Sequence, residues 1–323
     1  PFLQEEPLQT DTGAAVVLSS LMAGDRTIEA KDSPLFFNKE KGVAVVPLSQ
    51  HLVARLVAPL SFHSTNTIRN RRRQRLERLE REWDFLYNVR HRGIVRVYER
   101  VETSSGWIGF TQEKLEIDPH EDAVRPYIRT VGEWLGFGQA VAHALEAAHR
   151  HGIVNCDLKP SNIGIRVRAN GSREPVIHDW DRLQRIGDFS SDTQDEDSKS
   201  IALTPWFASP EQVDRKRIYP PSDVFSLAVT LLSLATGKPG FGGQVIVVTF
   251  ELILTGAYQH WLTFKDSVQF RMAHRVLERA IDRNPNKRYQ SAKDFARALL
   301  AVERSLTQDQ LNLVLRPHRQ AST

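Results

Sequence analysis

The chain has 323 residues, of which 41% are hydrophobic, so it can bury the core of one large or two modest domains. Its 43 Lys and Arg residues exceed its 39 Asp and Glu residues by a formal charge of only +4, too little to require a nucleic acid or a membrane surface as partner. A single cysteine excludes an internal disulfide and is typical of a reducing compartment, so we expect a cytoplasmic protein.

No apolar run approaches the roughly 18 residues that a membrane-spanning helix needs, and we find no signal-peptide pattern, so we expect no membrane span. The sequence starts at Pro1 rather than at Met, and we expect it to be a segment of a longer protein. Residues 1–40 are rich in Gln, Glu, Asp, Gly and Ser apart from one apolar patch, Ala14–Met22. We expect these residues to form a partly ordered N-terminal extension.

Residues 41–113 predict a small lobe of antiparallel strands with one long helix. The strands are expected as two pairs joined by short polar turns, Gly42–Leu48 with His51–Val57 and Ile94–Glu102 with Trp107–Gln112. Between the pairs, Leu76, Leu79, Trp83 and Leu86 recur at helical spacing within Ile68–Leu86. The predicted order is therefore strand, strand, helix, strand, strand.

Residues 114–303 predict a larger, mainly helical lobe, and residues 304–323 a C-terminal tail. Residues 132–150 carry an apolar face typical of an amphipathic helix, and helical periodicity dominates after Glu211. Ile163–Arg168 and Val176–His178 are expected to pair as a hairpin, because Asn170-Gly171 between them favours a tight turn. The chain as a whole therefore predicts an α+β fold.

A polar loop after the helix of residues 132–150 carries the most informative side chains. Asp157, Lys159 and Asn162 supply a carboxylate, an ammonium and a carboxamide at spacings that converge in a loop, with apolar residues anchoring both sides. Phosphoryl transfer needs such groups: an acceptor to orient a hydroxyl, a cation for phosphate charge and an oxygen for a metal ion. The alternative interpretation is a polar surface loop beside a strand.

This run resembles the catalytic loop of protein kinases, in which His-Arg-Asp is followed by Asn. Asn155 stands at the His position and Cys156 at the Arg position, so two of the usual residues are altered. By the resemblance, Asp157 and Lys159 are the catalytic residues and Asn162 holds a metal ion. Cys156 by itself could be a thiol nucleophile, but no partner base is evident and we expect it to fill space.

The segment Val176–Asp181 resembles the kinase motif Asp-Phe-Gly. Asp179 takes the place of the metal-binding Asp, Trp180 that of the aromatic residue and Asp181 that of the glycine. The resemblance implies that Asp179 holds Mg²⁺ together with Asn162, and oxygen ligands suit that ion. Loss of the glycine restricts the backbone at position 181, which favours a fixed geometry.

Three later segments resemble further kinase motifs in the same order, namely Thr204–Glu211, Ser222–Leu232 and Arg283–Tyr289. The resemblance implies structural roles for Glu211, Asp223 and Arg288, with Arg288 paired to Glu211, and for Thr204, whose hydroxyl can bridge Asp157 and Lys159. Lys159 followed by Pro160, and Thr204 followed by Pro205, are similar to Ser/Thr rather than Tyr kinases.

In the small lobe the resemblance implies nucleotide contacts but departs from the family pattern. Arg55 stands where kinases have a phosphate-binding Lys, and Glu82 is aligned as its helix partner. Since an Arg is not equivalent to a Lys there, Lys41 is an alternative phosphate contact. The glycine-rich loop is reduced to Gly42. The remaining expected nucleotide contacts are Val53, the hinge residues Thr111, Gln112 and Glu113, and Gly164 on the adenine floor.

The resemblance as a whole covers about residues 42–303 and implies a two-lobed protein kinase-like fold that uses ATP and Mg²⁺, with Mn²⁺ as a possible substitute. Two functions remain open. One is a divergent Ser/Thr protein kinase that acts on a protein hydroxyl. The other is a pseudokinase that senses nucleotide or presents surfaces to a regulatory protein partner. A kinase acting on small molecules is disfavoured, because Thr204–Glu211 suits a platform for a protein substrate.

Two further patterns were weighed for binding. The arginine-rich start of the helix at Ile68–Leu86 could be a nucleic-acid patch, but Glu77, Glu80 and Glu82 interleave, which favours a solvated face or a docking surface for acidic substrates. Nucleic acid is therefore not expected as a partner. Three histidines, His143, His149 and His151, have no Cys or carboxylate at ligand spacing, and we expect no metal site there.

Overall fold

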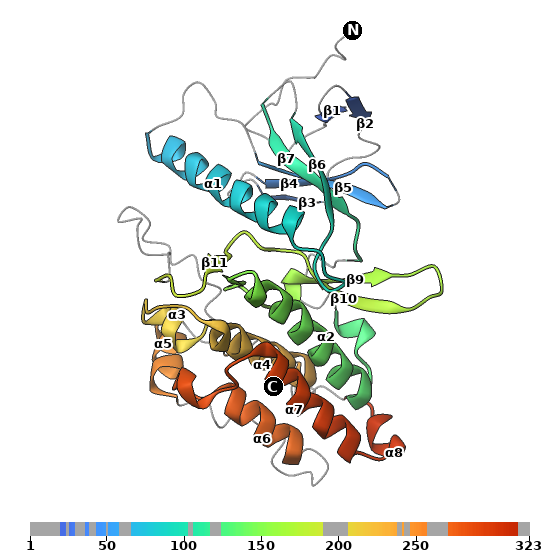
Figure 1. The fold of residues 1–323 in the computed structure, drawn as a ribbon, viewed down its shortest axis with the longest axis vertical. Coiled ribbons are helices and arrows are strands. Elements are labelled where there is room, and N and C mark those ends of the chain that lie inside the picture. The colour runs from blue at the N-terminus through green and yellow to red at the C-terminus, as the bar shows by residue number, and fades with distance from the viewer. Residues whose placement is uncertain are drawn as a thin grey trace, which may run out of the picture. The chain divides into compact units, whose positions relative to one another are not determined.

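The protein is represented by a computed structural model, which describes residues 20–23, 26–29, 36–38, 43–49, 51–57, 66–102, 106–116, 124–189, 206–237, 241, 246–256 and 271–315. The chain divides into two compact units. Residues 1–90 and 94–115 form the first, and residues 91–93 and 116–323 form the second. The first unit holds an antiparallel sheet with one long helix and the second is mainly helical, which confirms the predicted α+β fold (Figure 1).

A seven-stranded antiparallel sheet forms the body of the first unit, in the order β2-β1-β6-β7-β5-β4-β3. Its strands are β1 (Ser20–Ala23), β2 (Arg26–Glu29), β3 (Phe36–Asn38), β4 (Val43–Pro47), β5 (Leu52–Val57), β6 (Val97–Glu102) and β7 (Ile108–Glu113). The pairs β4–β5 and β6–β7 are the two predicted strand pairs.

The sheet continues into a part of the chain for which the sequence predicted no strand. β1 pairs with β6 through Met22 and Glu102, and β3 pairs with β4. Each of the strands β1, β2 and β3 has only three or four residues. An alternation of polar and apolar residues cannot be recognised over so short a run, which is why these strands escaped prediction.

The backbones of the central strands β5 and β7 lie unusually close together at Gly109. Arg55 lies opposite Phe110 and Leu56 opposite Gly109. A Cβ atom added to Gly109 would lie 1.8 Å from the carbonyl oxygen of Arg55. Glycine is therefore required at this position, because any side chain would push the two strands apart.

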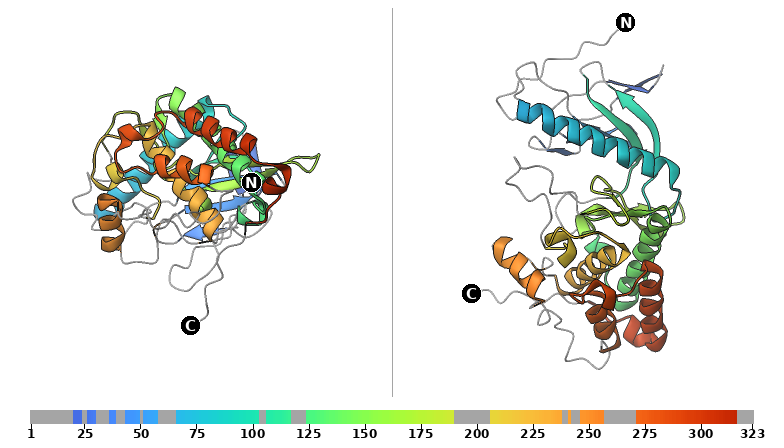
Figure 2. Two further views of the ribbon diagram at one scale, coloured as in Figure 1. Left: turned by 90° about the horizontal axis from the view of Figure 1, so that it is seen from below. Right: turned by 60° about the vertical axis from the view of Figure 1, so that its left-hand side comes forward.

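The helix α1 (Asn66–Asn88) lies beside the sheet of the first unit, as Figures 1 and 2 show. Of the predicted apolar positions, Leu79, Trp83 and Leu86 are buried, while Leu76 is half-buried. The ring of Trp83 lies 5.7 Å from that of Phe110 on β7, measured between centroids. The predicted helix and its buried face are confirmed.

Helices make up most of the second unit, together with two small antiparallel pairs of strands. Its helices are η1 (Arg125–Tyr127), α2 (Val131–Arg150), η2 (Pro160–Asn162), α3 (Pro210–Val213), α4 (Pro220–Thr236), α5 (Ile246–Thr255), α6 (Arg271–Ala280), η6 (Pro285–Lys287), α7 (Ala292–Ser305) and α8 (Gln308–Leu311). Its strands are β8 (Ile153–Val154), β9 (Ile163–Val167), β10 (Arg173–Ile177) and β11 (Gln184–Arg185). None of the described helices is both long and apolar enough to cross a membrane.

The core of the second unit lies around α4, in which 14 of 17 residues are buried. The helices α2 and α7 pack against α4 and against each other. Gly138 on α2 allows this close packing, because an added Cβ would lie 2.9 Å from side-chain atoms of both Leu231 and Leu299. The Trp134 indole on α2 donates a hydrogen bond of 2.9 Å to the Leu231 carbonyl.

The hairpin of β9 and β10 confirms the prediction made from Asn170-Gly171. The two strands pair from Ile163 with Ile177 to Val167 with Arg173. Gly171 has a φ of +79°, the left-handed conformation that a glycine adopts without strain. This hairpin places Asn162 just before one strand and Asp179 just after the other.

The C-terminal segment packs against the start of α2. The backbone N–H of Val131 donates to the carbonyl of Leu313, and that of Leu315 donates to the carbonyl of Arg129, at 3.0 and 2.9 Å. Residues 306–315 of the predicted tail therefore belong to the second unit. The sequence analysis did not predict this docking.

Replacing Gly109 by Ala tests the close approach of β5 and β7. We expect Gly109→Ala to lower the free energy of unfolding by roughly 2–3 kcal/mol, because the new methyl group overlaps the Arg55 carbonyl. Gly136→Ala is the matched control: Gly136 lies in α2, and its added Cβ meets no atom within 4 Å. The control should be stabilising by about 0.5–1 kcal/mol. Urea unfolding of both variants measures this, and equal effects would contradict the argument.

Candidate active site

The loop that carries Asp157 is anchored by hydrogen bonds to the carboxylate of Asp223. Asp223 is fully buried in the first turn of α4, and the backbone N–H groups of Asn155 and Cys156 donate to it at 2.8 and 3.0 Å. His149 Nε2 lies 2.9 Å from the same carboxylate. The partner of His149 lies 74 residues away along the chain, so local spacing could not reveal it.

Cys156 takes an unusual backbone conformation in this loop. Its φ of +67° is left-handed, which is rare for a residue other than glycine. The Gln212 side chain on α3 donates a hydrogen bond of 2.7 Å to its carbonyl. The buried thiol packs in an apolar cluster with Val154 and Ile218. A buried thiol in apolar surroundings is unreactive, which supports the expectation that Cys156 fills space.

Asp157 is oriented by three neighbouring side chains. Lys159 Nζ lies 3.0 Å from Asp157 Oδ2, and Asn162 Nδ2 donates both to that oxygen at 3.0 Å and to the Asp157 carbonyl at 2.7 Å. Arg182 Nε lies 3.6 Å from the same carboxylate oxygen. The three residues that the sequence placed together, Asp157, Lys159 and Asn162, are therefore in direct contact. Arg182 was not anticipated.

Asn155 connects the loop of Asp157 to the segment of Asp179. Its side-chain oxygen accepts from the backbone N–H of Asp157 at 3.2 Å, and its Nδ2 donates to the backbone carbonyl of Asp179 at 3.2 Å. The side chain is fully buried. Asn155 thus fixes the spacing of the two carboxylate-bearing segments, a role that the sequence did not suggest for an altered motif residue.

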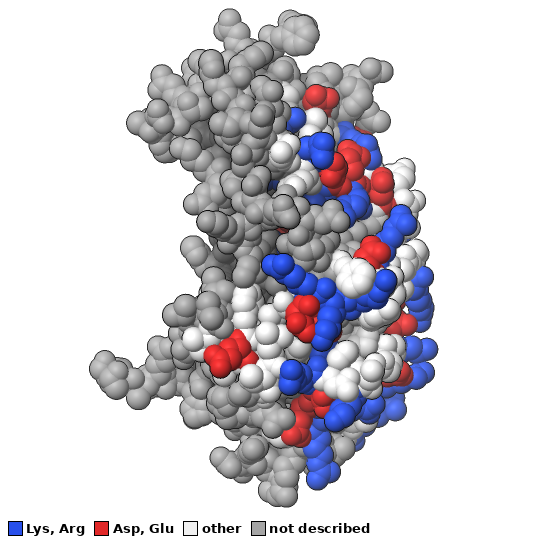
Figure 3. All heavy atoms as spheres, turned by 90° about the vertical axis from the view of Figure 1, so that its left-hand side faces the viewer, with Lys and Arg blue, Asp and Glu red and all other residues white. Residues whose placement is uncertain are grey.

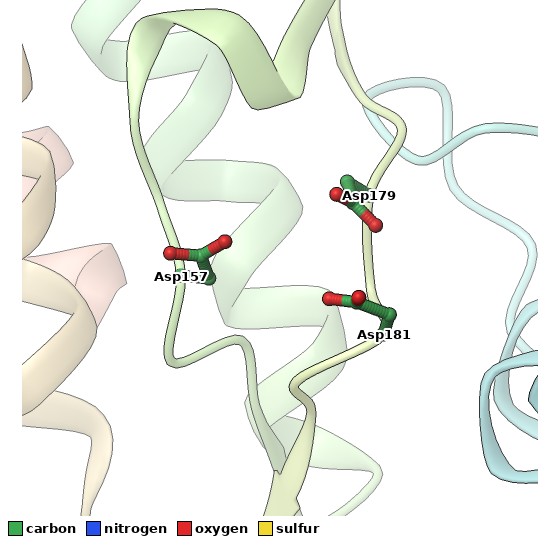
Figure 4. Close-up of side chains that lie close together, drawn as sticks. All are labelled: Asp157, Asp179 and Asp181. Carbon is green, nitrogen blue, oxygen red and sulfur yellow. The ribbon is translucent and has the colours of Figure 1, made fainter. Parts of the chain in front are cut away.

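Three carboxylates face one another across these two segments. One oxygen from each of Asp157, Asp179 and Asp181 lies within 4.8 Å of the other two (Figure 4). Among the described residues, only this group of three or more His, Cys, Asp or Glu side chains has the arrangement of a metal site. Asp181 is the member of this group to which the sequence analysis assigned no site role. Its spacing of two from Asp179 was the available signal.

The backbone of the Asp179 segment does not require a glycine at position 181. Among the described residues other than glycine, positive φ values occur only at Cys156 and Arg215. Asp181 therefore adopts a conformation that any residue can take. Trp180 is fully buried, and its indole donates to the Ile177 carbonyl at 3.2 Å. These features agree with the fixed geometry expected from the loss of glycine.

A buried ion pair braces the segment that follows. Arg288 donates to the Glu211 carboxylate through Nη1 at 2.7 Å and Nη2 at 2.9 Å, and the hydroxyl of Ser222 donates to Glu211 at 2.6 Å. Burial alone raises the pKa of the Glu211 carboxyl. The hydrogen bonds and charge of Arg288, helped by Ser222, outweigh burial and lower that pKa below its ordinary value. The pairing that the resemblance implied is present in the structure.

In the first unit, Arg55 on β5 forms an ion pair with Glu82 on α1, the pairing that the alignment of these residues anticipated. Arg55 Nη1 lies 2.7 Å from Glu82 Oε1, and the Glu82 side chain is only 1% exposed. An Arg can therefore join the central strand to the helix at this position. A Lys there would offer one nitrogen in place of a planar fork.

The other described residues that were predicted to contact the nucleotide lie on strands β5, β7 and β9. Val53 on β5 and Thr111, Gln112 and Glu113 on β7 are buried, and Glu113 Oε1 accepts from the backbone N–H of Arg96 at 2.8 Å. Gly164 lies on β9 in the second unit and pairs with Val176. Three predicted residues lie outside the described part of the chain: Lys41, Gly42 and Thr204.

The arginine-rich helix α1 presents mixed charge. On its described part, Arg73 lies 3.4 Å from Glu77, and Glu80 contacts Arg100 of β6 at 2.6 Å. Figure 3 shows acidic residues interspersed with Lys and Arg on the described part of the face in view. This pattern favours a solvated surface over a nucleic-acid patch, which would require a field of one sign.

Comparison with known proteins identifies the family. Residues 62–306 match the model of the family described as protein kinase domain. The serine/threonine-protein kinase PknJ of Mycobacterium tuberculosis is 28% identical over 231 residues, which cover 70% of this chain and 38% of that protein. The serine/threonine-protein kinase PknB of Mycobacterium leprae is 28% identical over 244 residues, covering 70% of this chain and 36% of that protein. The match thus spans well under half the length of these relatives.

Removal of Arg288 from its buried ion pair with Glu211 should strongly destabilise the fold. We expect Arg288→Met to lower the free energy of unfolding by roughly 3–5 kcal/mol, because Glu211 then stays buried without its counter-charge. The control is Arg297→Met on α7, where an exposed Arg lies 3.1 Å from Asp294. That change should cost about 0–1 kcal/mol. Urea unfolding distinguishes the two, and similar losses would refute a dominant role for the buried pair.

The lowered pKa of Glu211 predicts a pH dependence of stability. A carboxyl whose pKa is lower in the folded than in the unfolded chain stabilises the fold above the ordinary value of 4.5, and this contribution disappears as the pH falls through the lowered folded pKa. Glu211→Gln should therefore reduce the melting temperature at pH 7, and the difference from the unmodified chain should shrink below about pH 4.5. Melting curves measured from pH 3 to 7 would test this. A difference that stays constant with pH would contradict it.

Proposed function

Because this chain belongs to the protein kinase family, we propose that it is a divergent Ser/Thr protein kinase that transfers the γ-phosphate of ATP to a protein hydroxyl. One observation carries the proposal: the carboxylate of Asp157 is held by Lys159 and Asn162 directly beside the carboxylate of Asp179. A hydrogen-bond acceptor, a cation and oxygen ligands for a metal ion thus meet at one place, which phosphoryl transfer requires.

Asp157 is proposed to orient the substrate hydroxyl and to accept its proton. Its Oδ2 faces Lys159 and Asn162, and its side chain is 9% exposed. The proton moves to this carboxylate as the hydroxyl oxygen bonds to phosphorus, and the bond from phosphorus to the leaving oxygen of ATP breaks. Lys159, at 3.0 Å, both holds Asp157 in place and supplies positive charge for the transferred phosphoryl group.

The oxygens of Asn162 and Asp179 fit the requirements of Mg²⁺, which prefers hard oxygen ligands and is usually held by one or two carboxylates. The amide nitrogen of Asn162 donates to Asp157, so Oδ1 is the atom of Asn162 that can ligate a cation. When bound, the ion neutralises charge on the phosphates of ATP. The residues themselves position it: Asn155 holds the Asp179 carbonyl and the Asp157 amide at a fixed spacing.

Arg55 is proposed to contact the nucleotide phosphates through its guanidinium, which also contacts Glu82 through Nη1. A guanidinium has five N–H donors in a planar fork. Phosphate is a bidentate acceptor that suits such a fork. A protein substrate with a Ser or Thr acceptor is supported by the adjacent Lys159 and Pro160 and by the relatives, which are named serine/threonine-protein kinases.

A second candidate function is a pseudokinase that senses nucleotide or binds a regulatory protein without transferring phosphate. The observation that favours it is the position of Arg182, whose Nε lies 3.6 Å from the Asp157 oxygen that Lys159 also contacts. Two cations at one carboxylate compete with a substrate hydroxyl for its oxygens. The two candidate functions differ in a single measurable property, the transfer of phosphate.

Substitution of Asp157 tests the proposed function. With radiolabelled ATP, Mg²⁺ and a generic basic protein substrate, the chain should incorporate label, and Asp157→Asn should reduce the rate by roughly 10²–10⁴-fold because the proton acceptor is lost. The control Asp188→Asn changes an exposed carboxylate and should leave the rate unchanged. Equal rates for all three proteins would rule out the assigned role. No transfer together with an ATP-dependent rise in melting temperature would favour the pseudokinase.

A further inference from the structure

Asp181 stands where the resemblance to protein kinases places a glycine, and it brings a third carboxylate to the proposed cation site. In Figure 4 the Asp181 side chain extends toward the segment of Asp157. Its oxygen lies within 4.8 Å of oxygens from both Asp157 and Asp179. A glycine at this position would contribute no ligand. The chain therefore differs from the family pattern in the donor set of this site.

Asp181, two residues after Asp179, lies in a turn that begins at Trp180. The Trp180 carbonyl accepts a hydrogen bond of 3.1 Å from the backbone N–H of Leu183. Trp180 lies between Asp179 and Asp181 and is fully buried, and its indole is fixed by a hydrogen bond of 3.2 Å to the Ile177 carbonyl. Burial of Trp180 and the turn hydrogen bond fix the backbone between the two carboxylates.

The spacing of the three oxygens suits one shared ion. Ligand oxygens on opposite sides of an ion are about twice the bond length apart, roughly 4.2 Å for Mg²⁺ and roughly 4.6–5.2 Å for Ca²⁺. Oxygens that all lie within 4.8 Å of one another can therefore surround a single divalent ion with small side-chain adjustments. Asp181 is half-buried, so it keeps contact with solvent from which an ion can enter.

Charge favours the same conclusion. Two cations, Lys159 and Arg182, lie beside Asp157 at 3.0 and 3.6 Å. Three carboxylates with these two cations carry a net charge of −1, whereas two carboxylates with the same cations would be neutral. A divalent ion is attracted to the first arrangement before any nucleotide phosphate is present. With a glycine at position 181, the ion would depend on phosphate oxygens for that attraction.

We propose that Asp181 is an additional carboxylate ligand at the cation site of Asn162 and Asp179, and that it allows the chain to bind a divalent cation in the absence of nucleotide. The proposal rests on the proposed function for the assignment of Asn162 and Asp179 to that site. It does not depend on whether phosphate is transferred. A hard divalent ion, Mg²⁺ or Mn²⁺, would then bind to the protein itself and would not need to enter the site together with ATP.

Binding of Mn²⁺ to the full chain without nucleotide tests this proposal. Free Mn²⁺ is counted by its electron paramagnetic resonance signal during titration, and competition with Mg²⁺ and Ca²⁺ shows which ions share the site. We expect one bound Mn²⁺ per chain. Both Asp181→Asn and Asp181→Gly should weaken binding by at least about tenfold, the lower bound for removal of a supporting group at a metal site.

The control is Asp188→Asn, which removes an exposed carboxylate seven residues further along and should leave the Mn²⁺ affinity unchanged. Circular dichroism of each variant shows whether the fold is retained. No nucleotide-free Mn²⁺ binding by the unmodified chain would overturn the proposal. So would equal Mn²⁺ affinity in the unmodified chain and in folded Asp181→Asn, because Asp181 would then serve only as a neighbour of the surrounding cations.

The two proposals can fail independently. If Mn²⁺ binding depends on Asp181 but no phosphate is transferred, the cation site stands and the kinase activity is refuted. If phosphate is transferred while Asp181→Asn leaves Mn²⁺ affinity unchanged, the activity stands and the third ligand is refuted. The Mn²⁺ titration contains neither ATP nor substrate, so a defect in either cannot influence its result.

Discussion

The buried carboxylate of Asp223 is the constraint on which the candidate active site depends. It lies at the start of α4, inside the core of the second unit, and accepts hydrogen bonds from two successive backbone N–H groups, those of Asn155 and Cys156. A buried carboxyl group must be satisfied by hydrogen-bond donors, because an unpaired polar group in the core is costly. Since its partners include the two residues before Asp157, movement of the loop would leave buried polar atoms unsatisfied.

The altered residues of the motif still form contacts that hold the site together. Asn155 is uncharged, yet its amide accepts from the Asp157 backbone and donates to the Asp179 backbone. Cys156 offers its carbonyl to Gln212, which joins the loop to α3. Arg55 pairs with Glu82 as the sequence analysis anticipated. The altered residues therefore pair with buried backbone and side-chain groups of the site, because donors and acceptors of different residue types can satisfy such groups.

A second buried charge fixes the segment after residue 205 relative to α4. Arg288, the residue after η6, binds Glu211, and the hydroxyl of Ser222 at the start of α4 donates to the same carboxylate. Gln212, the next residue, reaches the Cys156 carbonyl. The ion pair and the loop of Asp157 are thus linked through adjacent residues. A buried pair with both partners satisfied specifies one arrangement, because each misplacement leaves a charge unpaired in a medium of low polarity.

The sequence alone determined the fold class, the two strand pairs and helix of the first unit, the β9–β10 hairpin, and the grouping of Asp157, Lys159 and Asn162, because these follow from local periodicity, turn residues and short spacing. It could not show β1 to β3, which are too short to carry a pattern. The resemblance implied two contacts between residues far apart in the chain, Arg288 with Glu211 and Arg55 with Glu82, whereas other long-range contacts were decided by the tertiary structure alone. Asp223 with His149 is one, and the approach of Asp181 and Arg182 to Asp157 is another, because only folding brings such segments together.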